Sequence, residues 1–525
     1  ILASEGSLMF LVGIGGFGIQ RLKKRWDDEE LSKLLYAFIY RTYDPAHFAD
    51  SLYKLDPIVD EEHRPTWSIT IGVKSRVGGA ATERPVLCPN FLPLYSSSPF
   101  GIRTHVFAAM GEGIDVDRGK LTVLKDQVCH RFDKHEIEIL ELVHKSKRVP
   151  GVVEAVYHKS IELPFQLDYL AVGKVKHRHG LRQLGSPFAR IPTVKEMLQV
   201  KRNILHRDIS AGNVMYTPPS GDKQDLDTSM EDEEVLYFSE YFLSDSPVRP
   251  QTTSALLVDF NHAKYLTSET DGFHEPVDRT GTPGFIARAI DQGRPVDIPE
   301  WVPDRFLDSI PSAPDRYAKQ YRDSRLKKFP PKPLKNVTEM VDSAPWRHEL
   351  DHDIESVFWF MLDWAMTAQP KGGAVGHIRA SVWVHFTGRV VERHVLLSIG
   401  LLRGLMTDGT FHSTFRPIKG LFQKLAGVLS SMDRHWLPAS EERNDPEYFA
   451  EAFQRLILQF LIDHNHDDDG GFMNQPIESS PREVEQRRLQ GPWASRRSKL
   501  HGYFWNQDLD LDRSIDRVSE NGRVE

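Results

Sequence analysis

The sequence has little cysteine, no long apolar run and no excess of basic residues. Only Cys88 and Cys129 occur among the 525 residues, which excludes a disulfide-stabilised secreted scaffold and favours an intracellular compartment, cytoplasmic or nuclear. No stretch reaches the roughly 18 apolar residues of a membrane helix, so we expect no membrane partner. The 66 Lys and Arg are outnumbered by 74 Asp and Glu, giving a net charge of −8, and we expect no nucleic-acid partner.

The apolar content is nevertheless sufficient for a folded core. Hydrophobic residues make up 40% of the chain and 28 of them are Phe, which excludes a chain that is disordered throughout. Short β-like runs dominate the first part of the sequence, and helical patterns dominate residues 353–463. The acidic stretch 217–254 is typical of a solvated loop insertion. The charge-, Gly- and Ser-rich residues 464–525 predict a disordered tail.

Near the start, the run "GIGGFG" from Gly13 to Gly18 matches the fingerprint of dinucleotide-binding proteins. That fingerprint requires a strand–helix unit in which the N-terminus of the helix faces the pyrophosphate. The basic segment "IQRLKKR" follows instead, and basic side chains are unfavourable in the first turn of a helix. We therefore expect a glycine-containing hairpin at this position.

The segment "HELDH" from His348 to His352 matches the zinc-protease pattern H-E-x-x-H. On a helix this spacing places both imidazoles on one face, with Glu349 as the base. A third ligand should follow at modest distance, but the next acidic segment, "DIESVFWF", has a better explanation given below. We expect polar residues at the start of a helix rather than a metal site.

The most informative segment is "ILHRDISAGNVMY" at residues 204–216, which contains Asp208 and, five residues later, Asn213. This is the H-R-D-x-x-x-x-N pattern of a phosphoryl-transfer loop. A carboxylate such as Asp208 orients the attacking hydroxyl and accepts its proton. An amide oxygen such as that of Asn213 binds a metal that neutralises phosphate charge. The competing interpretation, a charged surface loop, does not account for the ordered spacing.

A second metal ligand is expected at Asp259. The strand-like run "ALLV" leads directly into "DFNHAKY", 46 residues after Asn213 in the sequence. Asp259 corresponds to the Asp of the D-F-G motif, which binds Mg²⁺ between the phosphates, and Asn261 replaces the Gly. The insertion 217–254 accounts for the unusual length of the gap.

A Lys–Glu pair is predicted upstream of the loop. Lys125 lies in the strand-like segment "KLTVLKDQV", and Glu136 lies 11 residues later in the helical segment "HEIEIL". In active kinases such a Lys binds the α- and β-phosphates and pairs with a helical Glu. Glu138 is the competing candidate, but the apolar pair that follows Glu136 favours Glu136.

The glycine-rich, phosphate-covering loop is only partly matched by this sequence. The segment "SPFGIRTHV" retains Gly101 and Val106 as candidate nucleotide-binding residues, but other positions of a glycine-rich loop are occupied by Pro99 and Thr104. Backbone N–H groups approach phosphates less freely where glycine is replaced.

Two later segments complete the pattern. "RTGTPGFIARAI" resembles the end of an activation segment, in which Thr280 or Thr282 is a candidate for phosphorylation and pairing with Arg207. The A-P-E motif expected there lacks its Glu, because Ala289 stands in that position. "HDIESVFWFMLDWA" resembles a buried helix whose Asp, here Asp353, supports the catalytic loop; an N-cap role is the alternative.

Together with "RLKKRWDDEE" and the late segment "HWLPASEERNDPEYFAEAFQRLILQFLI", these motifs resemble the fungal-type protein kinase family. The resemblance implies an α+β, two-lobed protein kinase-like fold with a β-rich N-lobe and a helical C-lobe. It also implies ATP and Mg²⁺ as cofactors and protein Ser/Thr hydroxyls as acceptors. The expected domains are a family-specific extension at 1–60, the N-lobe at 61–182, the C-lobe at 183–463 including the insertion 217–254, and a disordered tail at 464–525.

The segment between Gly185 and His206 departs from the family. Kinases place a short helix and a long packing helix before the catalytic loop, but only 20 residues are present here and only 194–200 has a helical pattern. The long helix is expected to be largely deleted, which would loosen Asp208. Two functions therefore follow: an ATP-dependent Ser/Thr-type protein kinase, or a catalytically impaired pseudokinase acting as a binding or scaffold module. A small-molecule kinase is a third possibility, against which the docking segment "RTGTPGF" argues.

Overall fold

A computed structural model describes the chain in separate segments. These are residues 2–5, 8–15, 18–25, 53–59, 65–77, 80–96, 103–109, 113–116, 119–130, 136–145, 151–162, 174–187, 206–216, 255–263, 281–293, 310–331, 348–373, 411–432, 447–464 and 471–478, with 149, 191, 194, 197, 393, 396 and 397. The chain divides into two compact units. One comprises 1–142, 153–184 and 503–525, and the other comprises 143–152 and 185–502.

The N-terminal glycine run forms a hairpin, as the sequence predicts. Strand β2 (Leu8–Gly15) pairs antiparallel with β3 (Gly18–Arg25), and β1 (Leu2–Glu5) pairs with the other edge of β2. Gly15 and Gly18 face each other where the hairpin turns. Because a strand follows the glycines where a nucleotide-binding unit requires a helix, the dinucleotide interpretation is excluded.

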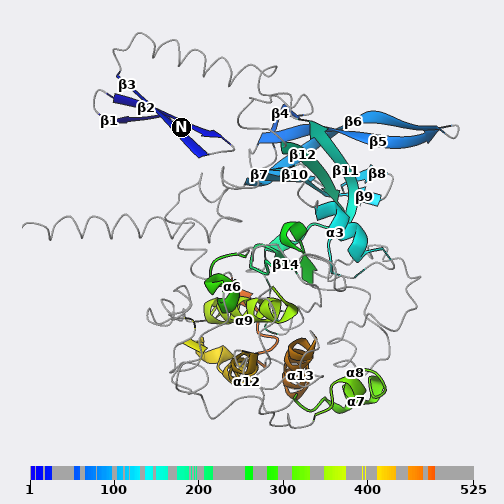
Figure 1. Cartoon of the computed structure of the whole chain (residues 1–525), viewed down its shortest axis with the longest axis vertical. Coiled ribbons are helices and arrows are strands. Elements are labelled where there is room, and N and C mark those ends of the chain that lie inside the picture. Colours follow the sequence, from blue (N-terminus) through cyan, green and yellow to red (C-terminus); the bar gives the residue numbers. More distant parts are fainter. Residues whose placement is uncertain are drawn as a thin grey trace, which may run out of the picture. The chain divides into compact units, whose positions relative to one another are not determined.

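The first unit is dominated by a seven-stranded antiparallel sheet (Figure 1). Its order is β11-β12-β10-β7-β6-β5-β4. The strands are β4 (Tyr53–Val59), β5 (Pro65–Val77), β6 (Ala80–Ser96), β7 (Arg103–Ala109), β10 (Val123–His130), β11 (Ala155–Glu162) and β12 (Lys174–Leu181). A small hairpin of β8 (Ile114–Val116) and β9 (Gly119–Leu121) accompanies it.

The core of this unit consists of apolar side chains from alternate strand positions. Ile69 and Ile71 on β5 are both buried, as period-two alternation requires for residues on one face of a strand. They cluster with Cys88, Phe91, Phe107, Leu121, Leu124 and Val156. Burial raises the pKa of the Cys88 thiol to about 11, with the positive charge of Arg178 acting in the opposite direction, so this thiol is protonated and inert. Helix α3 (Glu136–Val143) forms where "EIEILELV" predicts a helix.

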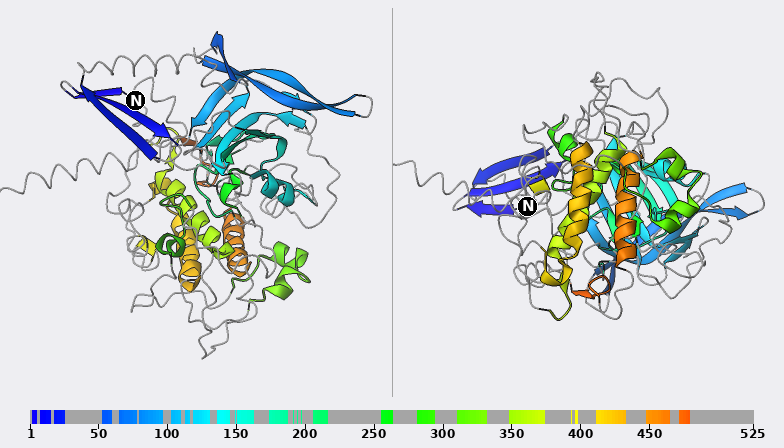
Figure 2. Two further views of the ribbon diagram at one scale, coloured as in Figure 1. Left: turned by 45° about the horizontal axis from the view of Figure 1, so that its top comes forward. Right: turned by 90° about the horizontal axis from the view of Figure 1, so that it is seen from below.

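The second unit is built around α9 (Leu350–Thr367), against which α12 (Ile418–Met432) and α13 (Tyr448–Asp463) pack. Figure 2 shows α12 and α13 side by side. Helix α9 is buried at consecutive positions such as Phe358, Trp359 and Phe360, which is the pattern of a helix enclosed on all sides. The Phe358 ring meets Phe422 of α12 edge to face, with centroids 5.8 Å apart.

Shorter elements complete this unit. Helices α6 (Arg288–Gln292), α7 (Asp315–Gln320) and α8 (Arg325–Lys328) lie between the catalytic-loop region and α9 in the sequence. Strand β14 (Val214–Tyr216) pairs with β13 (Ser186–Pro187) and β15 (Ala255–Leu257). The short 3₁₀ helices are η2 (Phe260–His262) and η4 (Ser413–Phe415).

One part of the predicted disordered tail is folded. Strand β17 (Ile477–Glu478) pairs with β16 (Gln369–Pro370), which follows α9 directly. Met473 is buried, and the Phe472 ring contacts Phe460 of α13. The prediction for 464–525 was wrong for 471–478, because two-residue strands leave no periodic pattern in the sequence.

The mixed helix and sheet content agrees with the α+β expectation. The insertion 217–254 lies outside the described residues, so its loop character stays a prediction. Among the described residues, no helix is long and apolar enough to cross a membrane.

Candidate active site

The loop at residues 206–213 is fixed by the strand pair that follows it. Strands β14 and β15 run antiparallel with Val214 opposite Leu257, and the N–H of Val258 donates to the Asn213 carbonyl at 2.9 Å. Asn213 precedes one strand and Asp259 follows the other. The pairing therefore brings to one end of the strand pair two residues that the sequence separates by 46 positions.

Within the loop, Asn213 is bonded directly to Asp208. The Asn213 side-chain N–H₂ donates to the Asp208 carbonyl at 2.8 Å and to carboxylate oxygen Oδ2 of Asp208 at 2.8 Å. Ser210 tightens the turn between them, because its carbonyl accepts from the Asn213 N–H at 3.0 Å and its hydroxyl oxygen accepts from the Gly212 N–H at 3.3 Å. With its nitrogen committed to Asp208, the Asn213 amide presents its oxygen as the group that can bind a cation.

The loop backbone is strained at two positions. Arg207 and Asp259 have φ values of 66° and 65°, and they are the two non-glycine residues with positive φ in the described part of the chain. Such conformations cost about 1–3 kcal/mol each and persist only where the surroundings enforce them. Here His206 contacts the Val258 carbonyl at 2.9 Å, and Arg207 donates to the His262 carbonyl at 3.3 Å. The strain occurs at both predicted site segments.

Asp353 on α9 holds the same loop from the other side. Its carboxylate accepts from the backbone N–H groups of His206 and Arg207, the latter at 3.0 Å. Asp353 is 2% exposed, so these charge-assisted bonds form away from solvent. The predicted support of the loop by Asp353 is present, and Asp353 does not cap its helix.

The histidines of "HELDH" have structural roles. His352 accepts from the Glu349 N–H at 2.9 Å and forms a capping box with the Glu349 side chain at the start of α9. His348 contacts Asp353 at 3.1 Å. Burial lowers the pKa of His348, while the bond to Asp353 acts in the opposite direction. The predicted helix-start role is confirmed.

Thr282 contacts the predicted catalytic carboxylate directly. Its hydroxyl and its backbone N–H both donate to Asp208 Oδ1, each at 2.7 Å. The sequence places Thr282 only in an activation segment, as a candidate for phosphorylation. Its hydroxyl bonds to Asp208, and no residue pattern specifies a contact across 74 positions. In the sequence, the feature that connects Thr282 with the site is its position in the segment "RTGTPGF".

Asp259 lies two residues after β15, in the left-handed conformation, and the following turn contributes a side-chain partner. The Asn261 amide N–H donates to Asp259 Oδ1. Asn261 occupies the position of the Gly in D-F-G, so this residue holds the carboxylate instead of leaving it unconstrained. Carboxylate and amide oxygens are the ligands that Mg²⁺ prefers, and Asp259 and Asn213 supply one of each. The donor set fits a hard divalent cation.

The predicted Lys–Glu contact is present in the sheet unit. The Lys125 ammonium on β10 lies 2.7 Å from Glu136 Oε2 on α3, and the two residues are 4% and 1% exposed. Burial raises the pKa of Glu136, but Lys125 and His179 lower it more, so the carboxylate is ionised. Glu138 is exposed, so Glu136 rather than Glu138 is the residue that contacts Lys125.

The remaining two nucleotide-binding candidates are Val106 and Gly101. Val106 is half-buried on β7, directly opposite Lys125 in the strand register. Gly101 lies outside the described residues, so its role stays a prediction.

Residues 191–365 match the model of the family described as fungal protein kinase. The resemblance to the fungal-type protein kinase family is thereby confirmed. The match contains Asp208, Asn213, Asp259, Thr282 and Asp353, whose contacts are described above, and it supports a protein kinase-like function in general. Lys125 and Glu136 precede the matched segment. No curated protein matches the chain significantly.

Next to Ala289, which stands in the Glu position of the A-P-E motif, this chain has a buried ion pair. Arg288, which follows Ala287, donates through Nε to Glu355 Oε1 on α9 at 2.6 Å, and its backbone N–H donates to the same oxygen at 3.0 Å. Trp359 also donates to Glu355, at 2.8 Å. Burial raises the pKa of Glu355, and Arg288 lowers it by more. The guanidinium group of Arg288, the residue before Ala289, thus joins this segment to α9.

The segment between Gly185 and His206 is described at three internal positions. Ile191, Val194 and Met197 are buried, and the backbone at Val194 and Met197 is helical. A spacing of three residues is that of one helix face. The family match begins at 191, so these three positions belong to the matched segment. The loss of the preceding long helix stays a prediction.

Proposed function

We propose that this chain is an ATP-dependent protein kinase of two-lobed fold that transfers the γ-phosphate to Ser or Thr hydroxyls of proteins. The observation that carries the proposal is the loop geometry. The Asn213 amide nitrogen and the Thr282 hydroxyl hold the two oxygens of Asp208 in fixed directions, and two strained residues are maintained beside them. Strain kept at a polar loop is typical of a site with a catalytic requirement.

In the proposed reaction the substrate hydroxyl oxygen forms a bond to the γ-phosphorus. The bond from that phosphorus to the β,γ-bridging oxygen breaks, and ADP leaves with the electron pair. Asp208 orients the hydroxyl and accepts its proton. Asn213 and Asp259 would hold Mg²⁺, which supplies neutralisation of the phosphate charge, and Lys125 would bind the α- and β-phosphates.

The decisive experiment is transfer of label from γ-labelled ATP, with Mg²⁺, to a mixture of degenerate Ser, Thr and Tyr peptides, followed by identification of the labelled amino acid. Label on Ser and Thr supports the proposal. Label on Tyr alone would refute the Ser/Thr assignment. A rise in melting temperature with ATP and Mg²⁺ but without transfer would favour the pseudokinase alternative, to which the short segment before the loop points.

Lys125→Met is expected to lower kcat/KM by about 10²- to 10³-fold, since removal of one preorganised charge from a transition state has about that effect. Steady-state transfer at several ATP concentrations measures it. Because Lys125→Met leaves Glu136 buried without its cation, Lys125→Arg is the second variant, and the melting temperature of each is compared. Lys120→Met, on β9, is the control and should match the wild type. Unchanged transfer by both Lys125 variants would contradict the assigned role.

Thr282→Val is expected to lower turnover roughly tenfold. A hydrogen bond to a charged group is worth about 1.5–3 kcal/mol, and about 1.4 kcal/mol corresponds to tenfold in rate. Thr282→Ser retains the hydroxyl and should stay within a few-fold of the wild type. Equal turnover by the Val and Ser variants would show that the hydroxyl does not position Asp208.

A further inference from the structure

Three histidines meet on one face of the sheet, outside the loop region. His177 and His179 are two residues apart on β12, so their side chains share a face. His158 on β11 lies directly opposite His179 in the strand register, and Ser160 lies opposite His177. One ligand atom from each imidazole lies within 4.8 Å of the others. Strand register therefore assembles a cluster from residues about 20 positions apart in the sequence.

The spacing of the rings suits a tetrahedral metal ion. A zinc–nitrogen bond of about 2.0–2.1 Å, with roughly 1.1 Å more from nitrogen to ring centre, places the centres of coordinating imidazoles about 5 Å apart. The observed separations are 5.4 Å for His158 and His179, 5.8 Å for His158 and His177, and 6.2 Å for His177 and His179. Small rotations of the three histidine side chains would bring the ring centres to the separation that zinc requires.

The outer contacts of the cluster are those of a metal-binding histidine. His179 Nδ1 lies 3.4 Å from the Glu136 carboxylate, and His177 Nδ1 lies 3.1 Å from the Ser160 hydroxyl. Histidines that bind metals usually direct one ring nitrogen to a carboxylate or another polar partner and the other nitrogen to the metal. His179 is 0% exposed, and neither of its ring nitrogens has a hydrogen-bond partner among the described residues, although Nδ1 lies at ion-pair distance from Glu136. Burial of such a nitrogen is costly unless a ligand satisfies it.

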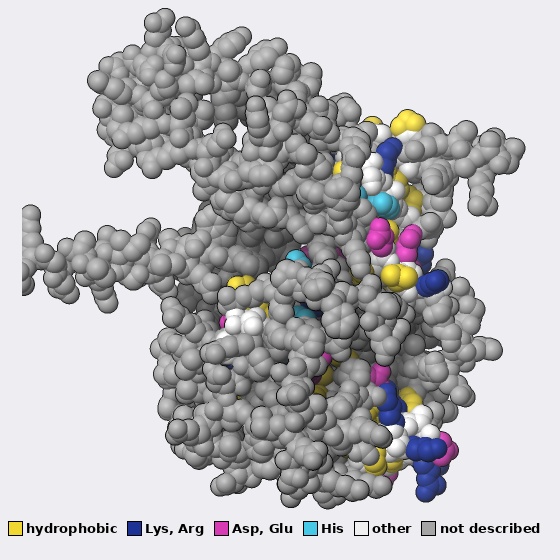
Figure 3. Space-filling model, viewed as in Figure 1, with side chains coloured by type: hydrophobic (Ala, Val, Ile, Leu, Met, Phe, Trp, Pro, Cys, Tyr) yellow, Lys and Arg dark blue, Asp and Glu magenta, His cyan; other side chains and the backbone are white. Residues whose placement is uncertain are grey.

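The solvent exposure of the cluster and the chemistry of its three imidazoles also fit a metal site. His158 is exposed, whereas His177 and His179 are buried, so one side of the cluster opens to solvent. Histidine side chains are visible at the surface in the space-filling view (Figure 3). Three imidazoles with an open fourth position are a ligand set that zinc and related transition metals accept, and one that the oxygen-seeking Mg²⁺ does not favour.

We propose that His158, His177 and His179 form a binding site for one divalent transition-metal ion, for which Zn²⁺ is the best match, with water in the fourth position. Glu136 and Ser160 orient two of the ligands. The site uses neither of the oxygen ligands Asn213 and Asp259, and the proposal does not depend on kinase activity.

The test is equilibrium dialysis of the full chain against Zn²⁺ without ATP, with metal content measured per chain. The wild type is expected to bind one more equivalent of Zn²⁺ than His158→Gln. Because this variant loses a direct ligand, its affinity at the site should fall by more than the roughly 10- to 100-fold that is typical of losing an outer hydrogen-bond partner. His158 is exposed, so the variant should fold, and circular dichroism checks this. His105→Gln, an exposed histidine on β7, is the matched control and should bind as the wild type does.

Two more variants sharpen the result. His158→Cys supplies another zinc ligand and should restore the equivalent, and Co²⁺ in that variant and in the wild type should give the intense visible absorption of tetrahedral cobalt. Ser160→Ala should weaken Zn²⁺ binding by about 10- to 100-fold without loss of the equivalent. Identical stoichiometry and affinity in the wild type, His158→Gln and His177→Gln would overturn the proposal and leave the three histidines as packing residues.

Discussion

Asp208→Asn will lower phosphoryl transfer by about 10³- to 10⁴-fold, the upper part of the range measured for removal of a general acid or base. Asn has nearly the same shape and can still accept from the Thr282 N–H and hydroxyl, which bond to one oxygen of Asp208 at 2.7 Å. It cannot accept the proton of the substrate hydroxyl. Single-turnover transfer from γ-labelled ATP measures the effect on the chemical step.

Affinity for ATP and Mg²⁺ separates this effect from damage to the fold. Asp208 is not among the residues proposed to hold the metal, so the dissociation constant of the nucleotide should change by less than a few-fold. Asp315→Asn, at the exposed first turn of α7, is the control and should match the wild type. Equal incorporation of label by Asp208→Asn and the wild type would contradict the proposed kinase activity.

Glu451→Gln will reduce the free energy of unfolding by about 3–5 kcal/mol, the cost of breaking a buried ion pair by removing one partner. Glu451 on α13 is 0% exposed and accepts from the Tyr317 hydroxyl at 2.6 Å, from Arg325 at 2.6 Å and from Arg455 at 2.9 Å. Arg455 is itself buried. The substitution leaves both guanidinium groups near a neutral amide, and chemical denaturation at pH 7 measures the loss.

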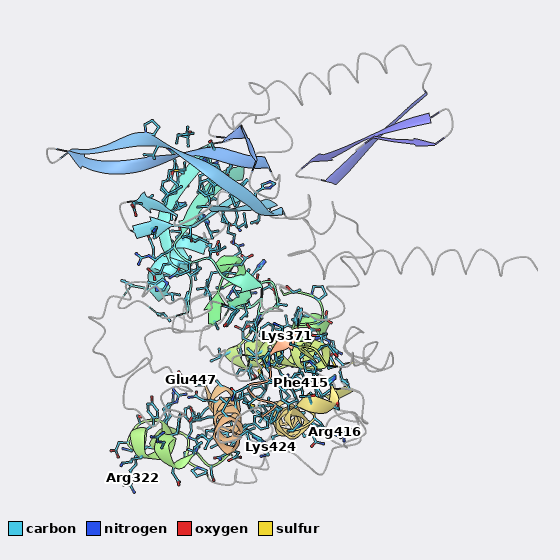
Figure 4. All side chains as sticks on the ribbon, turned by 180° about the vertical axis from the view of Figure 1, so that it is seen from behind. Arg322, Lys371, Phe415, Arg416, Lys424 and Glu447 are labelled. Carbon is cyan, nitrogen blue, oxygen red and sulfur yellow. The ribbon has the colours of Figure 1, made fainter. Side chains whose placement is uncertain are left out.

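A matched control lies one helical turn away. Glu447, at the start of α13 (Figure 4), contacts Arg325 at 3.5 Å and Lys328 at 3.4 Å, and its side chain is 34% exposed. Exposed pairs of this kind contribute about 0–1 kcal/mol, so Glu447→Gln should be nearly neutral. The same loss of stability in both variants would show that burial of the ion pair is not the cause.

The effect of Glu451 should also depend on pH. Burial raises the pKa of this carboxyl, but Arg325, Tyr317 and Arg455 lower it by more, so its pKa in the folded protein is below the usual value. A lowered pKa stabilises the folded state fully above the unfolded pKa of about 4.3, and this contribution is lost as the pH falls through the folded pKa. The difference in stability between the wild type and Glu451→Gln should therefore narrow as the pH is lowered below about 4.

The sequence predicted those contacts that are encoded by short spacing. Asp208 and Asn213 lie in one loop, and Lys125 and Glu136 lie 11 residues apart on adjacent elements, so each pair is constrained by the chain itself. The support from Asp353 was predicted only through family resemblance, because its partners lie 146 and 147 residues away.

Contacts between charged residues that are buried in the fold could not be predicted from the sequence. Glu451 and Arg455 have the i, i+4 spacing of an ordinary exposed pair, and nothing local distinguishes them from one. Arg288 and Glu355 are 67 residues apart and individually resemble surface residues. The histidine cluster required the register of β11 against β12, and a shift by one residue would move His158 to the other face.

The pairing of β17 with β16 bears on where the helical unit around α9 can be cut. A fragment cut after α13 at Asp463 would remove the partner of Gln369 and Pro370 and the Pro476 carbonyl that accepts from the Lys371 N–H at 2.8 Å. It would also uncover the surface of α13 on which Phe472 packs. A fragment that keeps these contacts must therefore extend at least through Glu478, and truncation short of that residue would expose a sheet edge and apolar surface that favour aggregation.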